Sequence, residues 1–337
     1  MQLKDVGEFG LINHLTRNLR SYDSSVVLGI GDDAAAFKVT EGSYVLVSCD
    51  MLIEGRHFIF DKIKPAELGY KALAVNLSDI AAMGGIPRHA LISVGWPDYV
   101  DLAYTEQVYN GFQEIAEIYG INILGGDTVK APQLVLDVTA IGESKRPPIT
   151  RKGAKAGDVI AVTGRVGASA AGLELLTGDC RGCVSEDVFK HLITAHLKPV
   201  PRVKEAGVLA ETGGATAMID ISDGVASEVN HICAGSNVGA LVYADKLPID
   251  NETRLAGEAL KKDCLQWALY GGEDYELLVT LPAGRVAAVS VVLGKMGVDF
   301  SVIGEMVDKI NGITIMSEDV ILPLKSRGYN HFGGDLK

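Results

Sequence analysis

The sequence predicts an α+β protein of two domains, and three observations support this prediction. The chain has 337 residues, whereas a typical domain has about 150. Segments with the helical spacing of apolar residues are mixed with short runs of strand-forming residues. The stretch ESKRPPITRKGAKAGD at 143–158 combines prolines, glycines and basic residues, a composition typical of a boundary between compact units. We therefore expect domains at residues 1–145 and 146–337.

Helices and strands of the first domain follow from local patterns. Helical spacing predicts helices at 8–19, 65–83 and 101–119, and Gly84-Gly85 ends the second of them. Extended apolar runs predict strands at 44–49, 89–96 and 134–141, with a short strand before Gly125. The segment after Asp50 is expected to be a loop.

The second domain shows the same mixture. Strands are predicted at 159–163, in a segment ending at Asp220, and at 239–243, 275–281 and 300–303. A turn rich in glycine and alanine leads from the first strand into a helix, two or three helices extend to Glu211, and another helix opens near Asp223.

Composition and charge exclude several classes of protein. Hydrophobic residues make up 47% and charged residues 22%, as in ordinary globular proteins. No apolar run approaches the roughly 20 residues needed to cross a bilayer, and the start MQLKDVGEFG does not resemble a signal peptide. Five cysteines do not favour a disulfide framework. We therefore expect a soluble protein of the cytoplasm.

The acidic balance bears on the partners. The chain carries 43 acidic and 31 basic residues, a formal net charge of −12, and it has no run rich in lysine and arginine. Nucleic acid and membrane are therefore not expected partners. A polyanionic substrate would also be repelled unless divalent cations stood between it and the protein.

Several carboxylates share one setting: each follows an apolar run and is flanked by small residues. Taken singly, such residues commonly cap helices or form turns. As a set they indicate a common site. The motifs are GIGDDAA (Asp32, Asp33), VLVSCD (Asp50), AVNLSDIAAMGG (Asp79), NILGGDT (Asp127), AMIDISDG (Asp220, Asp223) and YGGEDYE (Glu273, Asp274).

Asp79 is the most informative of these residues. It shares the apolar face of a predicted helix with Leu68 and Val75, so we expect its carboxylate to be buried. An unpaired buried carboxylate is costly, and no lysine or arginine lies one turn away. A bound cation would resolve this, and Asn76 would offer an amide nearby. Carboxylate and hydroxyl ligands favour Mg²⁺ or Mn²⁺ over zinc.

Two other possibilities concern zinc and phosphate. A zinc site is suggested by a pair of cysteines, Cys180 and Cys183, that is followed by a pair of histidines, His191 and His196. The gap between the two pairs is shorter than in zinc fingers, so we set this site aside. No Walker or kinase glycine motif is present. Phosphate could instead meet Gly125-Gly126, the turn Thr163–Gly167 at a helix start, or the basic residues Arg151, Lys152 and Lys155.

The order and spacing of the motifs resemble those of the thiamine-monophosphate kinase family across nearly the whole chain. The shared motifs are GIGDDAA, SCDMLIEGRHF, YKALAVNLSDIAAMGG, LGGDT, TRKGAKAGD, IDISDG, GGEDYEL and GYNHF. The wider superfamily includes aminoimidazole ribonucleotide synthetase, formylglycinamidine synthetase and selenophosphate synthetase. Those enzymes share the aspartate-rich ATP site but not the combination of G-x-H-F, GGEDYEL and a terminal GY-x-HF.

The resemblance implies an aminoimidazole ribonucleotide synthetase-like fold of two domains. Its N-terminal domain would bind ATP and Mg²⁺ and pair into a homodimer, with strands of both subunits forming a β-barrel. Its C-terminal α/β domain would complete the active site. The implied reaction, a step of thiamine diphosphate biosynthesis, transfers the γ-phosphate of ATP directly to thiamine monophosphate, assisted by several Mg²⁺ ions.

The resemblance also implies roles for individual residues. Metal ligands would be Asp33, Ser48, Cys49, Asp50, Asp79, Asp127, Asp220 and Asp223. The catalytic set would be Asp33, Asp50, Asp79, Asp127 and Asp220. Nucleotide contacts would come from Gly126, Asp127, Arg151 and Ser222, and contacts to thiamine monophosphate from His57, Glu273 and Tyr329.

One position departs from the family, which usually has threonine where this chain has Cys49. A thiol is a poor Mg²⁺ ligand, so this contact would hold only through the carbonyl. Two alternatives stay open: another ATP-dependent enzyme of the superfamily, and a regulator that binds Mg²⁺ and nucleotide without catalysis. A selenophosphate synthetase would need a reactive cysteine in an N-terminal glycine-rich loop, and the hydrogenase-maturation member a terminal cysteine. This chain has neither.

Overall fold

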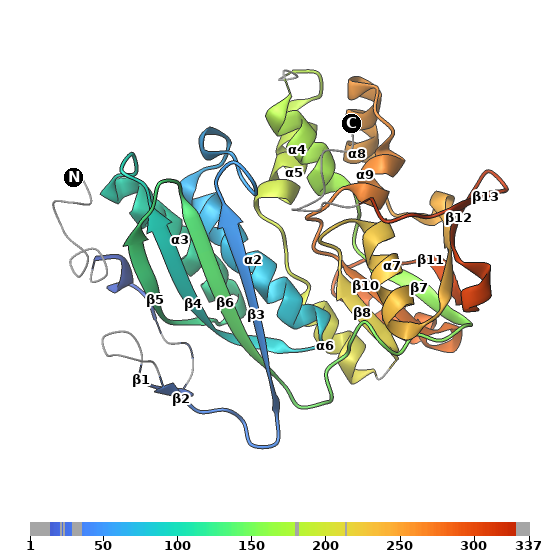
Figure 1. Cartoon of the computed structure of the whole chain (residues 1–337), viewed down its shortest axis with the longest axis horizontal. Helices are drawn as coiled ribbons and strands as arrows, with labels where there is room; N and C mark the ends of the chain where they lie inside the picture. Colours follow the sequence, from blue (N-terminus) through green and yellow to red (C-terminus); the bar gives the residue numbers. More distant parts are fainter. Residues whose placement is uncertain are drawn as a thin grey trace. The chain divides into compact units, whose positions relative to one another are not determined.

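The computed structural model describes residues 14–20, 22, 24–28, 36–178, 182–212 and 214–327. The chain divides into two units (Figure 1). Unit 1 comprises residues 1–81 and 85–148, and unit 2 comprises residues 82–84 and 149–337. Among the described residues, no helix combines the length and apolar character that a bilayer crossing requires.

Unit 1 is built on a four-stranded sheet in the order β3-β6-β4-β5. These strands are β3 (Tyr44–Ile53), β4 (Ile86–Trp96), β5 (Asn122–Lys130) and β6 (Val135–Ser144). Strand β6 is antiparallel to both β3 and β4, whereas β4 and β5 are parallel. Strands β1 (Val26–Leu28) and β2 (Ala36–Phe37) pair separately. The described sheet is open, with β3 and β5 at its edges, so the barrel expected from the resemblance is not closed within the described part of this chain.

Helices α2 (Pro65–Ala82) and α3 (Leu102–Tyr119) lie against one face of this sheet (Figure 1). Helix α3 starts where Asp101 accepts a hydrogen bond from the N–H of Tyr104. The two helices approach so closely that a Cβ atom on Gly69 would lie 1.9 Å from the carbonyl oxygen of Val108. A Cβ atom on Gly111 would lie 1.9 Å from the carbonyl oxygen of Ala66. Glycine is therefore required at both positions.

The opposite face of the unit 1 sheet, which we call the open face, carries apolar side chains. Along β3 the residues at odd positions point to this face, because side chains alternate along a strand. Val45, Val47 and Met51 are exposed by 47%, 64% and 48% respectively. Leu46 and Leu52 point to the helical face and are buried.

Unit 2 is built on a seven-stranded mixed sheet in the order β13-β12-β9-β11-β7-β10-β8. The strands are β7 (Asp158–Thr163), β8 (Ala217–Asp220), β9 (Gly239–Tyr243), β10 (Leu277–Pro282), β11 (Phe300–Val307), β12 (Ile313–Ser317) and β13 (Val320–Pro323). Neighbours are antiparallel except for β12 and β9. Ile160, Val162 and Ile219 of this sheet pack in one core with Val229 and Ile232 of α7 (Val225–Ser236).

A second core of unit 2 lies among its helices. Ala171, Leu175, Leu192, Ala256 and Trp267 pack together there. They come from α4 (Ala168–Thr177), α5 (Glu186–Leu197), α8 (Asn251–Leu260) and α9 (Cys264–Tyr270). The remaining helices are α6 (Val203–Glu211) and α10 (Val286–Lys295), with short 3-10 turns at Phe60–Lys62, Ala244–Lys246, Ala283–Arg285 and Lys309–Asn311.

The structure corrects two boundaries that bear on the site. Strand β3 does not end at Cys49 but continues to Ile53, because residues 50–53 pair with β6. Strand β5 likewise passes Gly125 and reaches Lys130, paired with β4. In both cases the pairing partner lies far along the chain, which a local pattern does not reveal. The predicted helix at 8–19 lies mostly outside the described residues.

The contact between α2 and α3 leads to a prediction for stability. Gly111→Ala should destabilise the protein by about 2 kcal/mol or more, because the methyl group meets backbone atoms that cannot move without separating the helices. Gly207→Ala in α6 is the matched control, since no atom lies within 4 Å of its Cβ position. That change should be neutral or stabilise by up to about 1 kcal/mol. Thermal unfolding followed by circular dichroism measures both; equal effects would contradict the packing argument.

Candidate active site

Unit 1 brings Ser48, Asp50 and Asp79 together between β3 and α2. The hydroxyl of Ser48 donates a short hydrogen bond to Oδ2 of Asp79. Oδ1 of Asn76, one turn before Asp79, accepts a hydrogen bond of 3.0 Å from the N–H of Asp50. Asn76 is fully buried and also donates to the carbonyl of Ala72 at 3.1 Å. Asp79 is half-buried, whereas the sequence predicted a buried carboxylate. Its side chain therefore lies at the edge of the core.

The two carboxylates of this group repel each other. The pKa of Asp50 is raised to about 7; burial is the largest cause, followed by the neighbouring charge of Asp79, a hydrogen bond with Asp79 and the charge of Asp137. The Asp50 carboxyl thus keeps its proton up to near neutral pH. A divalent cation would replace this proton and remove the repulsion, and the donors are oxygen atoms of the kind that Mg²⁺ prefers.

Two other metal-ligand candidates of unit 1 lie on the open face of the sheet. Cys49 pairs with Thr139, Ser93 pairs with both Asp137 and Asp127, and neighbouring partners point to the same side. Cys49 and Asp127 therefore point away from Ser48 and Asp50. The structure does not gather all four side chains on one face.

The surroundings of Cys49 do not favour metal binding by its sulfur. A hydrogen bond from Thr139 lowers the pKa of the thiol, but burial and the Asp137 carboxylate raise it more, so the pKa lies above its usual value. The thiol donates to Oδ1 of Asp137 at 3.2 Å. A protonated thiol is a poor ligand for Mg²⁺. The sequence motifs did not reveal Asp137, which is acidic but follows no turn or glycine.

Gly126 and His57 have well-defined local roles. Gly126 has φ of 154°, and a Cβ atom there would lie 1.6 Å from the carbonyl oxygen of Ile92, so only glycine lets β5 approach β4 at this point. His57 folds back in the turn after β3, where its Nδ1 accepts a hydrogen bond of 3.0 Å from the N–H of Ile53. The neutral ring therefore carries its proton on Nε2.

Unit 2 brings its own candidates together where two loops meet. The N–H of Glu273 donates to the carbonyl of Ser222 at 2.8 Å, and the N–H of Tyr275 donates to the carbonyl of Ile221 at 2.9 Å. A Cβ atom on Gly272 would lie 2.4 Å from the carbonyl oxygen of Ser222. The GGEDY segment is thus held against the loop that follows Asp220, and Glu273 adopts a left-handed backbone with φ of 68°.

Glu228 completes this acidic group, although no motif pointed to it. It lies on α7 with 1% exposure, and its Oε1 accepts a hydrogen bond of 3.0 Å from the N–H of Asp223. Burial raises the pKa of Glu228 to about 8; the N–H of Asp223 opposes this rise, the charges of Asp220 and Asp223 add to it, and Arg151 opposes it. Glu228 is therefore close to two further carboxylates, and a bound cation would relieve their repulsion. The feature of the sequence that could have identified Glu228 is its position one turn into α7, the helix that follows Asp223.

The turn Thr163–Gly167 does not offer the free helix N-terminus that the sequence suggested. The carboxylate of Asp274 accepts hydrogen bonds from the N–H of Gly167 at 2.7 Å and from the N–H of Ser169 at 3.1 Å. Burial raises the pKa of Asp274 to about 8, although these two bonds favour its ionised form. A side chain of the protein thus occupies the anion position at the start of α4.

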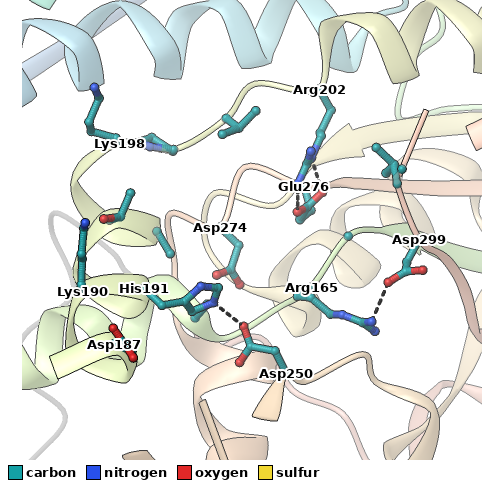
Figure 2. Close-up of a pocket in the computed structure, with 18 residues that line it drawn as sticks. Arg165, Asp187, Lys190, His191, Lys198, Arg202, Asp250, Asp274, Glu276 and Asp299 are labelled. Atoms are coloured by element: carbon teal, nitrogen blue, oxygen red, sulfur yellow. Dashed lines mark hydrogen bonds and ion pairs between the residues drawn. The ribbon is translucent and has the colours of Figure 1, made fainter. Parts of the chain in front are cut away.

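A cavity of about 620 Å³ lies beside Asp274, within unit 2 (Figure 2). Its charged side chains largely pair with one another: Arg202 with Glu276, Arg165 with Asp299 and His191 with Asp250 (Figure 2). Asp274 of the YGGEDYE motif lines it, as do Gly164 and Arg165 of the Thr163–Gly167 turn, whereas none of the residues to which the family resemblance assigns a role does. The paired charges leave little net attraction for a polyanion.

The zinc alternative is not supported. His191 is exposed and pairs with Asp250 at 2.9 Å, whereas His196 is buried with its Nδ1 3.0 Å from the hydroxyl of Ser169. Although the cysteine count does not favour a disulfide framework, Cys183 is disulfide-bonded and so has no thiolate to offer a metal. Cys180 lies outside the described residues.

Two predicted site residues, Asp33 and Tyr329, also lie outside the described residues.

The comparisons with known proteins cover nearly the whole chain. Residues 31–144 match the model of the AIR synthase related protein N-terminal domain, and residues 155–316 match that of the C-terminal domain. A thiamine-monophosphate kinase of Escherichia coli K12 is 39% identical over 97% of this chain and 98% of its own. One from Bacillus subtilis is 38% identical over 96% of this chain and 99% of its own. The chain belongs to the thiamine-monophosphate kinase family.

Solved structures agree with this family assignment. Thiamine-monophosphate kinase from Stenotrophomonas maltophilia has a TM-score of 0.81 and 33% identity, covering 92% of this chain and 95% of its own. The structure of AaThiL complexed with AMPPCP and TMP has a TM-score of 0.78 and 33% identity, covering 98% and 99%. The hydrogenase maturation protein HypE of Escherichia coli, at 21% identity and a TM-score of 0.76, shares the fold alone. The two-domain AIR synthase-like fold of the thiamine-monophosphate kinase family is thereby established for this chain.

The raised pKa of Asp50 leads to a prediction for pH dependence. The pKa of Asp50 in the folded protein, about 7, exceeds the ordinary value of 3.8. The folded state therefore binds a proton that the unfolded chain releases, so this group's stabilisation is present below about pH 4 and is lost as the pH rises towards 7. With EDTA present, the unfolding temperature should fall between pH 5 and pH 8.

Asp50→Asn should reduce this fall, leaving the part that Glu228 and Asp274 cause with the same sign. Adding Mg²⁺ at pH 8 should raise the unfolding temperature of the wild type more than that of Asp50→Asn. An equal fall in both proteins would show that Asp50 is ionised throughout this range.

Proposed function

We propose that this protein transfers the γ-phosphate of ATP to thiamine monophosphate and so forms thiamine diphosphate. The observation that supports this most directly is its similarity, over nearly the full length, to AaThiL complexed with AMPPCP and TMP. The two acidic groups of the structure, around Asp50 and Asp79 in unit 1 and around Asp220 and Asp223 in unit 2, agree with a reaction between two phosphates.

The residue types suit this reaction. The nucleophile is an oxygen of the acceptor phosphate, which is already ionised at pH 7, so no general base is required. Catalysis then consists of aligning two anions in line and of compensating their charge. The catalytic residues in this proposal are Asp33, Asp50, Asp79, Asp127 and Asp220.

The donor set fits Mg²⁺, since its ligands are oxygen atoms and the charge of Asp79 raises the pKa of the neighbouring Asp50 carboxyl. In this proposal Asp33, Ser48, Asp50 and Asp79 bind Mg²⁺ in unit 1, Asp127 binds it separately on the open face, and Asp220 and Asp223 bind it in unit 2. Cys49 contributes its carbonyl oxygen alone. When bound, the ions compensate the charge of the transferring phosphoryl group.

The remaining residues position the two substrates. We assign the nucleotide to Gly126, Asp127, Arg151 and Ser222, where Gly126 provides close access to the backbone. We assign the acceptor to His57, Glu273 and Tyr329. The Nε2–H of His57 would donate to the acceptor phosphate, whereas the carboxylate of Glu273 and the ring of Tyr329 suit the positive thiazolium ring.

The decisive experiment incubates the purified protein with ATP and Mg²⁺ and measures ADP and the phosphorylated product. Thiamine monophosphate should be converted, while the phosphorylated substrates of the related synthetases should not. Asp79→Asn should lower kcat by at least about 100-fold, because it removes a charge needed at the transferring phosphate. Its unfolding temperature should stay near that of the wild type.

The control for this variant is Asp98→Asn, which changes an exposed aspartate paired with Lys130 and should leave the rate unchanged. ADP formation with another acceptor would favour a different enzyme of the superfamily. Nucleotide binding without any turnover would favour a regulator. A near-normal rate of Asp79→Asn at saturating Mg²⁺ would remove Asp79 from the catalytic set.

We also propose that two copies of this chain form a homodimer through the open face of the unit 1 sheet. Val45, Val47 and Met51 expose a continuous apolar row on β3, and such a row is unusual on a free surface. Stacking of two such sheets would bury these side chains and would give the dimeric barrel that the family resemblance implies.

Val47→Glu should convert the dimer to a monomer, because it places a charge in the middle of this apolar row. Light scattering after size exclusion gives the mass. Ile321→Glu on β13 is the matched control, since Ile321 is also an exposed aliphatic residue, at 58%, but lies in unit 2. A monomeric wild type, or a dimer that tolerates Val47→Glu, would contradict this interface.

A further inference from the structure

The main chain around Glu273 is fixed on both sides. Its N–H is bound by the carbonyl of Ser222, and Tyr275, which also has positive φ at 52°, is bound by the carbonyl of Ile221. Between them, Asp274 is anchored to the start of α4 through the N–H groups of Gly167 and Ser169. A non-glycine residue in the left-handed region is held there only by such surroundings. The origin of the Glu273 side chain is therefore fixed, and its direction depends on what the carboxylate contacts.

The carboxylate of Glu273 contacts a buried histidine. Oε2 of Glu273 lies 3.3 Å from Nδ1 of His196, whose side chain is 5% exposed, while that of Glu273 is 25% exposed. The same Nδ1 lies 3.0 Å from the hydroxyl of Ser169 on α4. The three side chains form a group that connects α4, α5 and the GGEDY segment.

Close packing of α4 and α5 brings His196 to this place. A Cβ atom on Gly172 would lie 2.1 Å from the carbonyl oxygen of Leu192 and 3.2 Å from the Cβ of His196. Glycine at this position lets the last turn of α5 approach the first turns of α4. His196 is consequently enclosed, and its ring cannot turn outwards without opening the contact between the helices.

The chemistry of the three groups defines their roles. A carboxylate oxygen only accepts hydrogen bonds, so the contact with Glu273 requires a proton on Nδ1 of His196, which is shared between Oε2 of Glu273 and the hydroxyl oxygen of Ser169. An imidazole that carries its only proton on Nδ1 can orient the carboxylate without cancelling its charge. A lysine or arginine in the same place would neutralise Glu273 and weaken its attraction for a cation.

We propose that His196, held by Ser169, is a positioning residue that aims the ionised carboxylate of Glu273 at the positively charged ring of the acceptor. This inference rests on the proposed function, in which Glu273 contacts the thiazolium ring of thiamine monophosphate. It adds two residues that act through Glu273 and make no contact with either substrate. Their loss affects binding of the acceptor and leaves binding of ATP unchanged.

The test compares substitutions of His196 by steady-state kinetics with both substrates. His196→Leu keeps much of the volume and removes the donor, and it should raise KM for thiamine monophosphate about 10-fold. KM for ATP should stay within about two-fold. His196→Asn places an amide nitrogen near the position of Nδ1 and should recover most of the loss. His191→Gln, on the exposed side of the same helix, is the matched control and should leave both KM values unchanged.

A double-mutant cycle shows whether His196 acts through Glu273. In the Glu273→Gln background, His196→Leu should have little further effect on KM for thiamine monophosphate, because the carboxylate that it orients is gone. Additive effects would overturn the proposal, as would equal rises in KM for ATP and for the acceptor. If His196→Leu does not fold by circular dichroism, Ser169→Ala and His196→Asn decide by the same split of KM values.

The outcome for the wild type separates this inference from the proposed function. A wild type that does not convert thiamine monophosphate overturns both. A wild type that converts it, together with a His196→Leu variant of unchanged KM for the acceptor, overturns the positioning role alone.

Discussion

Mutual repulsion of carboxylates is the constraint on which the functional parts of this structure depend. In unit 1, burial and then the neighbouring charge of Asp79 raise the pKa of Asp50 to about 7. In unit 2, Asp220 and Asp223 adjoin the buried Glu228, with Arg151 as their basic neighbour. A fold that needed only stability would not retain such groups, because each destabilises the folded chain at neutral pH. In the proposed function, cations that accompany a phosphate substrate would compensate these charges.

The scaffold keeps these groups in place through close backbone contacts. Glycine permits the approach of β5 to β4 at Gly126, of the GGEDY segment to the 221–224 loop at Gly272, and of α4 to α5 at Gly172. In each case a Cβ atom would lie within 2.4 Å of a carbonyl oxygen. The high glycine content of the chain, 39 residues, thus reflects backbone packing near the candidate site at these positions. The site is formed by rigid neighbours rather than by long side chains reaching across a cavity.

Local patterns predicted the regular elements well where the signal lies within one element. The helix at 65–83 matches α2, and the one at 101–119 matches α3 with Asp101 as its cap. The carboxyl ends of β3 and β5 were placed too early, because pairing with β6 and β4 extends them. Asn76 was placed correctly beside Asp79, since one helical turn fixes their relation. Asp137 and Glu228 were missed, because neither follows a glycine or ends an apolar run, and only strand pairing and helix packing bring them to the aspartates.

The sequence by itself determined the family, the mixed α and β character of the chain and the residue types that a phosphate-transferring site needs. These properties reside in local motifs and in their order, so they can be recognised before the chain folds. Only the tertiary structure decided which side chains meet: that Ser48, Asp50 and Asp79 share one face while Cys49 and Asp127 occupy the other, that Asp274 fills the N-terminus of α4, and that His196 adjoins Glu273. The physical reason is that strand register and helix packing set these contacts, and both depend on residues far apart in the chain.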